Sequence, residues 1–269
     1  MRALLLLAAF ATASCGAKLM KLPTGPGTPA SDGAMVSSEA TAACAGITTI
    51  TLEMSVHGSA QGRRLRGRLS AGLARPASAR LEAVASFGQP LFVFVAKDND
   101  ASLLLPRDNR VLEHGKPEEV LDAVTGVPID AAALRSLVSG CTKSASLDAH
   151  PLENVQALGD EWRVAADQGD SVYFQRVTSS GRWRLVAAVH PAGASGTGWR
   201  AEYSMFDDKL PRKVHLVSQP SGRFDLELDL SQVELNAALG PDAFRLQQTG
   251  RATPITLDEL RQSGPLGQK

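Results

Sequence analysis

The side chains able to catalyse a reaction or bind a metal are scattered along this sequence of 269 residues. Its five histidines show no metal-ligand spacing, among themselves or with the three cysteines. It contains no motif of a serine hydrolase or a zinc protease, no phosphate-binding glycine loop and no CxxC redox pair. The acidic pairs Glu118-Glu119 and Asp207-Asp208 fit a helix start and a turn. The sequence therefore predicts a protein that is not an enzyme and uses no metal or cofactor.

The chemistry that the sequence does indicate is acylation of Cys15. The preceding segment, MRALLLLAAFATAS, has a basic Arg2, an apolar run and small residues, as in an export signal. The apolar run is shorter than the roughly 20 residues that span a bilayer. Its end resembles a bacterial lipobox, with Thr12 where Leu is usual, which implies removal of residues 1–14 and lipidation of Cys15. A simple secretory signal is the alternative. Gly16, in place of Asp after the cysteine, favours the outer membrane.

The other cysteines, Cys44 and Cys141, allow two interpretations in an exported chain. An oxidising compartment favours a disulfide between them. Two free, buried thiols acting as small hydrophobic side chains fit the sequence equally well.

The charge balance excludes some classes of partner. Twenty-eight basic and 28 acidic residues cancel. A nucleic-acid partner needs a net positive domain, so none is predicted. Contact with a membrane must then come from apolar groups or from a covalent anchor.

The elements that position these residues are mainly β-strands. A flexible tether, rich in Gly, Pro, Ser and Thr, is predicted over residues 15–35, and an amphipathic helix over 36–50. An antiparallel meander follows, because short apolar runs alternate with turn residues. Its predicted strands cover 50–59, 62–74, 79–86, 91–97, 103–106 and 110–114.

The stretch RRLRGRLSAGL indicates that only one face of these strands is buried. Arg64, Arg66 and Arg68 alternate with Leu65 and Leu69, which predicts one wet face and one covered face.

A helical insertion near residues 117–140 separates this meander from a second one. Two short apolar-striped helices are expected there, divided by the turn Thr125-Gly126-Val127-Pro128. The predicted fold class is mainly β (α+β): an incomplete antiparallel β-barrel of about 11 strands, with short helices covering its concave face. Inward positions are dominated by Leu, Val, Phe and Ala, so an enclosed cavity would be apolar and suit acyl chains.

Two stretches, ASFGQPLFVFVA and EEVLDAVTGVPIDAAALRSLVSG, resemble the LolA/LolB superfamily of lipoprotein-localisation proteins, and LolB-like outer-membrane receptors in particular. In the first, Phe87-Gly88 stands where the family has an apolar residue, commonly Leu, before Gly in a protruding loop. In the second, the residues matching the lid motif Thr-Gly-x-Pro-Ile and a following Leu are Thr125, Gly126, Pro128, Ile129 and Leu134.

The resemblance implies a lipid-anchored protein on the periplasmic face of the bacterial outer membrane. Such a protein would take acyl chains of lipoproteins from a periplasmic LolA-like carrier and aid their insertion into the outer membrane. Phe87 would enter the bilayer; packing of Phe87 under a neighbouring hairpin is the alternative. The half-barrel domain is expected over 36–250, followed by a C-terminal tail over 251–269.

The cavity and lid residues expected from the resemblance lie on the strand after Phe87 and on the helical insertion. They are Phe92, Phe94, Val120, Leu121, Val124, Thr125, Gly126, Pro128, Ile129, Leu134, Leu137 and Val138, with some of Tyr173, Phe174, Trp183 and Tyr203. Three alternatives stay open: a carrier of another lipid or an envelope sensor on the same fold, a structural envelope lipoprotein with a filled interior, and an esterase acting on lipid.

Overall fold

A computed structural model describes residues 18–84, 90–142, 152, 154–167, 169–192, 196–207, 210–240, 242–247 and 250–263. Cys15, Phe87 and Gly88 lie outside the described residues.

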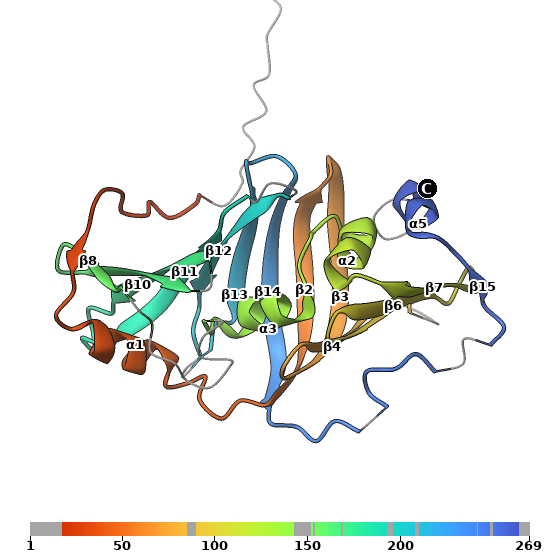
Figure 1. Ribbon diagram of the computed structural model, residues 1–269, viewed down its shortest axis with the longest axis horizontal. Coiled ribbons are helices and arrows are strands. Elements are labelled where there is room, and N and C mark those ends of the chain that lie inside the picture. The colour runs from red at the N-terminus through yellow and green to blue at the C-terminus, as the bar shows by residue number, and fades with distance from the viewer. Residues whose placement is uncertain are drawn as a thin grey trace, which may run out of the picture.

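The described strands form one open sheet (Figure 1). Their order is β1-β8-β9-β10-β11-β12-β13-β14-β2-β3-β4-β5-β6-β7-β15, and every neighbouring pair is antiparallel except β7 and β15. The strands are β1 (Thr28–Pro29), β2 (Thr49–Ala60), β3 (Arg63–Ala74), β4 (Ser78–Val84), β5 (Val93–Lys97), β6 (Asp100–Leu105), β7 (Arg110–Gly115), β8 (Gln156–Leu158), β9 (Trp162–Asp167), β10 (Asp170–Arg176), β11 (Trp183–His190), β12 (Gly198–Ser204), β13 (Lys213–Gln219), β14 (Phe224–Leu235) and β15 (Thr253–Pro254).

The sheet confirms the predicted class, an incomplete β-barrel with helices, although it has 15 strands in place of about 11. The difference arises partly from β1 and β15, which are two residues long, and β8, which is three. Strands this short show no alternation that a sequence pattern can reveal.

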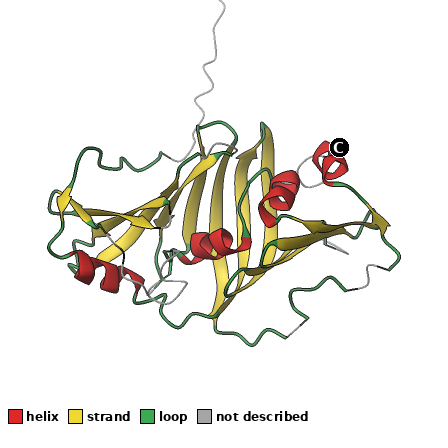
Figure 2. Cartoon of the chain, in the orientation of Figure 1, coloured by secondary structure: helices red, strands yellow, loops and turns green. Residues whose placement is uncertain are grey.

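Two helices, α2 (Pro117–Thr125) and α3 (Ala131–Ser139), lie on one face of the central strands (Figure 2). Pro117 occupies the first turn of α2, where its missing N–H costs nothing. Gly126 ends α2 at φ 79°, and its N–H donates to the Asp122 carbonyl. Asp130 caps α3 by accepting a 2.7 Å hydrogen bond from the N–H of Ala133. Two short helices therefore follow one another as the sequence predicts. Within the described part of the chain, every helix is too short or too polar to cross a bilayer.

The predicted first helix is misplaced. In the structure, α1 covers Gly33–Thr41 in place of 36–50, and β2 begins at Thr49. Gly46, at φ 77°, lies in the turn between them, in a conformation that disfavours a continuous helix. The Thr48 N–H donates to Asn236 Oδ1 at 2.8 Å, which holds the start of the strand beside the end of β14.

The predicted tether and tail are too long. Residues 28–29 pair with β8, and the N–H of Met20 donates to the carboxylate of Glu202 at 2.9 and 3.0 Å. At the other end, β15 pairs with β7, and Leu260 of helix α5 (Leu257–Ser263) is buried. These contacts join segments distant in sequence, so local composition does not reveal them.

A disulfide joins Cys44, after α1, to Cys141, after α3, with their Cα atoms 5.8 Å apart. It fixes the end of α3 to the N-terminal part of the domain across 97 residues of sequence.

Candidate functional site

An apolar cavity of about 110 Å³ lies between the two helices and the central strands. It is in the size range of engineered apolar cavities, of roughly 150 Å³, that bind one benzene. Its lining residues are Met54, Val56, Leu65, Arg66, Gly67, Arg68, Leu69, Leu81, Ala83, Leu91, Leu121, Thr125, Val127, Ile129, Leu134, Leu137, Leu216, Leu226 and Leu228.

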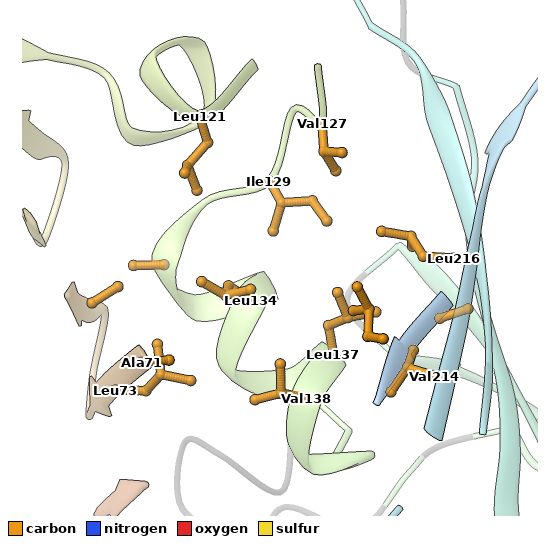
Figure 3. Close-up of a cluster of buried hydrophobic side chains, with 14 of the residues drawn as sticks. Ala71, Leu73, Leu121, Val127, Ile129, Leu134, Leu137, Val138, Val214 and Leu216 are labelled. Atoms are coloured by element: carbon orange, nitrogen blue, oxygen red, sulfur yellow. The ribbon is translucent and has the colours of Figure 1, made fainter. Parts of the chain in front are cut away.

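The roof of the cavity comes from α2, α3 and their connection. Leu121 of α2 and Leu134 of α3 lie on either side of Ile129 in the connecting turn (Figure 3). Leu134 and Leu137 are three residues apart, which places them on the same face of α3. The floor comes from alternate positions of β2, β3, β4, β13 and β14, since successive strand residues point to opposite faces.

The mouth of the cavity is at β3. Among the lining residues only Arg66, Gly67 and Arg68 are exposed, and the cavity is open to solvent. The described pairing of β3 with β4 ends next to Gly67, at Arg68 and Val84. A Cβ added to Gly67 would meet no atom of the described residues within 4 Å. The absence of a side chain at this inward position keeps the mouth open.

Arg66 and Arg68 flank Gly67 in β3, and strand alternation places their side chains on the opposite face of the sheet. Glu227, on the neighbouring part of the sheet, accepts hydrogen bonds from Lys213 at 2.8 Å and His57 at 3.1 Å. The hydrogen bond from Lys213 lowers the pKa of Glu227 and raises that of Lys213. Among the described residues, neither Arg66 nor Arg68 forms an ion pair within 4 Å. The outer face of the sheet at β3 therefore carries two arginines that form no ion pair among the described residues.

The roof is attached to the sheet through two contacts on α2. The guanidinium of Arg223 donates to the carboxylate of Asp122, and its Nη1 donates to Thr197 Oγ1 at 2.7 Å. Gly126 packs so closely on Ala60 that an added Cβ would lie 3.1 Å from its side chain. One polar and one close apolar contact thus hold the first roof helix in place.

Arg135 of α3 is a buried cation outside the cavity lining. It is 4% exposed, and its Nε has no hydrogen-bond partner among the described residues. Burial lowers the pKa of Arg135 to about 10, and the nearby charge of Arg75 adds to this effect. Burying a guanidinium in this way opposes folding.

The structure brings five of the predicted site residues to the cavity: Leu121, Thr125, Ile129, Leu134 and Leu137. Gly126 and Pro128 form the turn between the roof helices. The others, buried in the core but outside this lining, are Phe92, Phe94, Val120, Val124, Val138, Phe174, Trp183 and Tyr203; Tyr173 is half-buried.

The floor of the cavity was not predicted from the sequence. Met54, Val56 and Leu216 occupy the inward positions of long alternating strands. Their alternation predicts a buried face, but only the strand register decides which buried residues line a space.

The four histidines in the described part of the chain lie beside carboxylates. His190 Nδ1 lies 2.6 Å from Asp170 Oδ1, and its ring stacks on Trp199 at 5.5 Å. His215 Nε2 lies 2.8 Å from Asp225 Oδ1. The described part of the chain contains no group of three His, Cys, Asp or Glu residues that could hold a metal ion.

Comparison with known proteins identifies the fold. A LolA superfamily protein from Nitrosomonas europaea matches with a TM-score of 0.51 at 11% identity, over 80% of this chain and 97% of that one. A DUF1329 family protein from Desulfovibrio piger matches with a TM-score of 0.52 at 8% identity, over 83% of this chain and 99% of that one. No family model matches the sequence, and no curated protein is similar to it. The chain has a LolA-like fold.

Proposed function

We propose that this protein is a lipid-anchored envelope protein that binds acyl chains in the cavity under α2 and α3 and helps to insert them into the outer membrane. The observation that carries the proposal is the cavity itself. Its wall is apolar except near the mouth, it has a sheet floor and a two-helix roof, and it is open on one side. Each CH₂ group that leaves water for such a space contributes about 0.8 kcal/mol, so binding needs no catalytic group.

A long acyl chain requires the roof to move. A cavity of about 110 Å³ accommodates only part of such a chain. The roof is built from two nine-residue helices, and only α2 carries the Arg223 ion pair. Displacing α2 from the sheet would lengthen the cavity with little loss of backbone hydrogen bonding, because the bonds of the helix are internal, whereas the disulfide at Cys141 holds the end of α3.

Phe87 is the proposed point of entry into the bilayer. The described residues that flank the Phe87 segment lie beside the cavity: the Leu91 N–H donates to the Ala83 carbonyl at 3.0 Å, and both residues line the wall. An apolar residue between Ala83 and Leu91 in the sequence could bring a membrane close to the bound chain. Lipidation of Cys15 would hold the protein at that membrane through two or three acyl chains.

A role resembling that of LolB receptors is supported by the LolA-like fold together with the motifs around Phe87 and Thr125. In this role the protein would receive its cargo from a periplasmic LolA-like carrier. The cavity weighs against a structural protein whose interior is filled by its own side chains.

Native mass spectrometry tests the proposal. The mature chain with Cys15→Ser, which prevents lipidation, would be purified from a periplasmic fraction under mild conditions and its bound lipids extracted. We expect acylated peptides or other acyl lipids in near-stoichiometric amount. A ligand-free mass, together with no uptake of a fluorescent fatty-acid probe, would refute acyl binding.

A further inference from the structure

The outer face of the sheet, turned away from the cavity, carries a row of arginines on β3. Arg64, Arg66 and Arg68 alternate with Leu65 and Gly67, which line the cavity on the other face. All three arginines are exposed, and none of them forms an ion pair within 4 Å among the described residues. Successive members of this arginine row are about 7 Å apart along the strand, so their charges act together.

We propose that the arginine row binds the anionic phosphate headgroups of a bilayer, so that the outer face of the sheet lies on the membrane and the roof helices point away from it. This inference goes beyond acyl binding and rests in part on the proposed lipidation of Cys15. Guanidinium groups are planar, permanently charged donors that match phosphate oxygens. The chain has zero formal net charge, so the attraction would come from the arrangement of charges on this face rather than from the overall field.

The acids of β14 on this face are engaged by other cations. Glu227 accepts a 2.8 Å hydrogen bond from Lys213, and its carboxylate lies 3.1 Å from the His57 ring. Asp225 lies 2.8 Å from His215. These acids therefore do not neutralise the arginine row.

Two further acids lie beyond the end of the row at Arg68. Glu53 of β2 and Glu82 of β4 stand on either side of Ser70, the next outward residue of β3. Glu82 accepts a 2.7 Å hydrogen bond from Arg80. Among the described residues, no ion pair within 4 Å joins either acid to the arginine row.

The start of the described chain is bound to β12. The Met20 N–H donates to the Glu202 carboxylate at 2.9 and 3.0 Å, and the guanidinium of Arg200 donates to the Met20 carbonyl. Cys15 lies five positions before Met20, and five residues span at most about 18 Å. A lipid anchor on Cys15 would therefore keep a bilayer within about 18 Å of Met20.

The binding site of Met20 and the arginine row lie on the same face of the sheet. Residues directly opposite one another in neighbouring antiparallel strands point to one face. A continuous line of such pairs crosses the sheet from β12 to β3, and its members are Glu202, His215, Glu227, His57 and Arg66. Neighbouring strands are about 4.8 Å apart, so the two ends of the line are separated by about 19 Å. The anchor and the arginine row would therefore approach a bilayer from the same face.

The anchor favours a bilayer over an acidic protein as the partner of the row. A tether converts the contact of the row with the bilayer into an intramolecular event, which raises its effective concentration. Arg68 also pairs with Val84, and Phe87, the proposed point of bilayer entry, follows three positions later in the sequence.

Co-sedimentation with vesicles tests the inference on the mature Cys15→Ser chain, in which the arginine row acts without the anchor. The vesicles consist of phosphatidylglycerol, which is anionic, or of phosphatidylcholine, which has no net charge. The proteins are the parent chain, the triple variant Arg64→Gln/Arg66→Gln/Arg68→Gln, and a control with the same loss of charge, Arg107→Gln/Arg182→Gln/Arg251→Gln. The control arginines are exposed and form no ion pair among the described residues.

We expect the triple variant to bind phosphatidylglycerol vesicles about a hundredfold more weakly than the parent chain, because each arginine near an anionic surface contributes about fivefold. The control should bind as the parent chain does, and all three proteins should bind phosphatidylcholine vesicles equally. A triple Arg→Lys variant at the same positions, which keeps the charge, should retain most of the binding. Since the three arginines are exposed, each variant should unfold at the temperature of the parent chain.

The lipidated chain tests the orientation. A fluorescent label on Ser59→Cys, opposite Arg64 on the outer face, should be quenched by spin-labelled headgroups more strongly than one on Glu118→Cys in α2. Equal quenching at the two positions would show that the outer face does not lie on the membrane.

Other outcomes separate this inference from the proposed function. A chain without lipid on Cys15 that still prefers phosphatidylglycerol through the arginine row would retain the headgroup contact and refute the anchor. Equal binding of both vesicles by the parent chain would overturn the headgroup contact and leave acyl binding intact. If the parent chain then bound a polyglutamate peptide and the triple variant did not, the row would belong to an acidic protein partner instead.

Discussion

Arg223, at the turn between β13 and β14, is bonded to Asp122 of α2, which lies 101 residues earlier in the chain. The same guanidinium holds Thr197 at 2.7 Å. Through this one side chain, the first helix over the cavity is linked to two loops at the end of the sheet. If an acyl chain enters by displacing that helix, this link must break or stretch.

Asp122→Asn should therefore accelerate exchange of a bound acyl probe. The ion pair is partly exposed, so its loss should lower the free energy of unfolding by only about 1 kcal/mol or less. Stopped-flow fluorescence of probe release measures the rate. Glu118→Gln on the same helix is the control, because Glu118 forms no ion pair among the described residues. Equal release rates in both variants would show that the link does not restrain the roof.

Side chains of increasing size at Gly67 should close the cavity in steps. The position is extended and no described atom lies within 4 Å of an added Cβ, so Gly67→Ala should bind the probe normally, Gly67→Leu more weakly and Gly67→Trp hardly at all. Probe titration and thermal unfolding of the three variants separate occlusion from misfolding. Undiminished binding by a folded Gly67→Trp would place the entrance elsewhere.

The sequence allowed the roof of this site to be predicted, but not its floor. Leu134 and Leu137 lie in a helix whose start, stop and apolar stripe are local features, encoded by Asp130 and Gly140. Leu216 lies in a strand in which five consecutive residues are buried. Its position beside the cavity depends on pairing with β12 and β14, which no local pattern specifies.

The difference between local patterns and long-range pairing also explains why the tether and the tail were predicted to be longer than the structure shows. Residues 28–29 and 253–254 pair with strands more than 100 positions away in the chain. A composition rich in Gly and Pro is typical of a tether, but it does not prevent two residues from joining a sheet edge. Local signals identified the first strands and the paired helices, and long-range pairing determined the rest.

Asp32→Asn should destabilise the protein at neutral pH by about 1–2 kcal/mol. Arg163 binds the Asp32 carboxylate through two hydrogen bonds of 2.8 Å, and these bonds lower the pKa of Asp32 below its ordinary value of 3.8. Because the pKa of Asp32 is lower in the folded state than in the unfolded state, the ionised carboxylate stabilises the fold. This stabilisation is fully present above pH 3.8 and is lost as the pH falls through the folded-state pKa.

The difference in unfolding free energy between the parent chain and Asp32→Asn should therefore shrink on acidification, as denaturant titrations over a pH series can measure. Asp258→Asn is the control, because its pair with Arg261 is 82% exposed at the aspartate and should contribute little. A difference that stays constant through the acid range would contradict the assigned ionisation.

Reduction of the Cys44–Cys141 disulfide should lower the free energy of unfolding by about 2–5 kcal/mol, because the bond closes a long loop. Denaturant unfolding with and without a reductant measures the loss. The double variant Cys44→Ser/Cys141→Ser should match the reduced protein and show no further response to reductant. If reductant leaves the parent chain unaffected, the two cysteines are not joined in solution.

Phe87→Glu should impair delivery of acyl cargo to vesicles more than it impairs folding, since a charge at a membrane-entering tip is costly. Transfer of a fluorescent acyl lipid to vesicles and thermal unfolding report the two effects separately. Leu235→Glu places the same charge at an exposed apolar residue on β14 and should transfer normally. Unfolding of the Phe87→Glu variant would show that Phe87 belongs to the core.

The two edges of the sheet end in the same dipeptide. The outermost strands, β1 and β15, are each a single Thr-Pro pair. Proline has no N–H to donate, and a strand of two residues presents little backbone to a neighbouring molecule. An open sheet of 15 strands is otherwise a template for edge-to-edge polymerisation. Because both edge strands are short and contain proline, the protein should stay monodisperse at high local concentration.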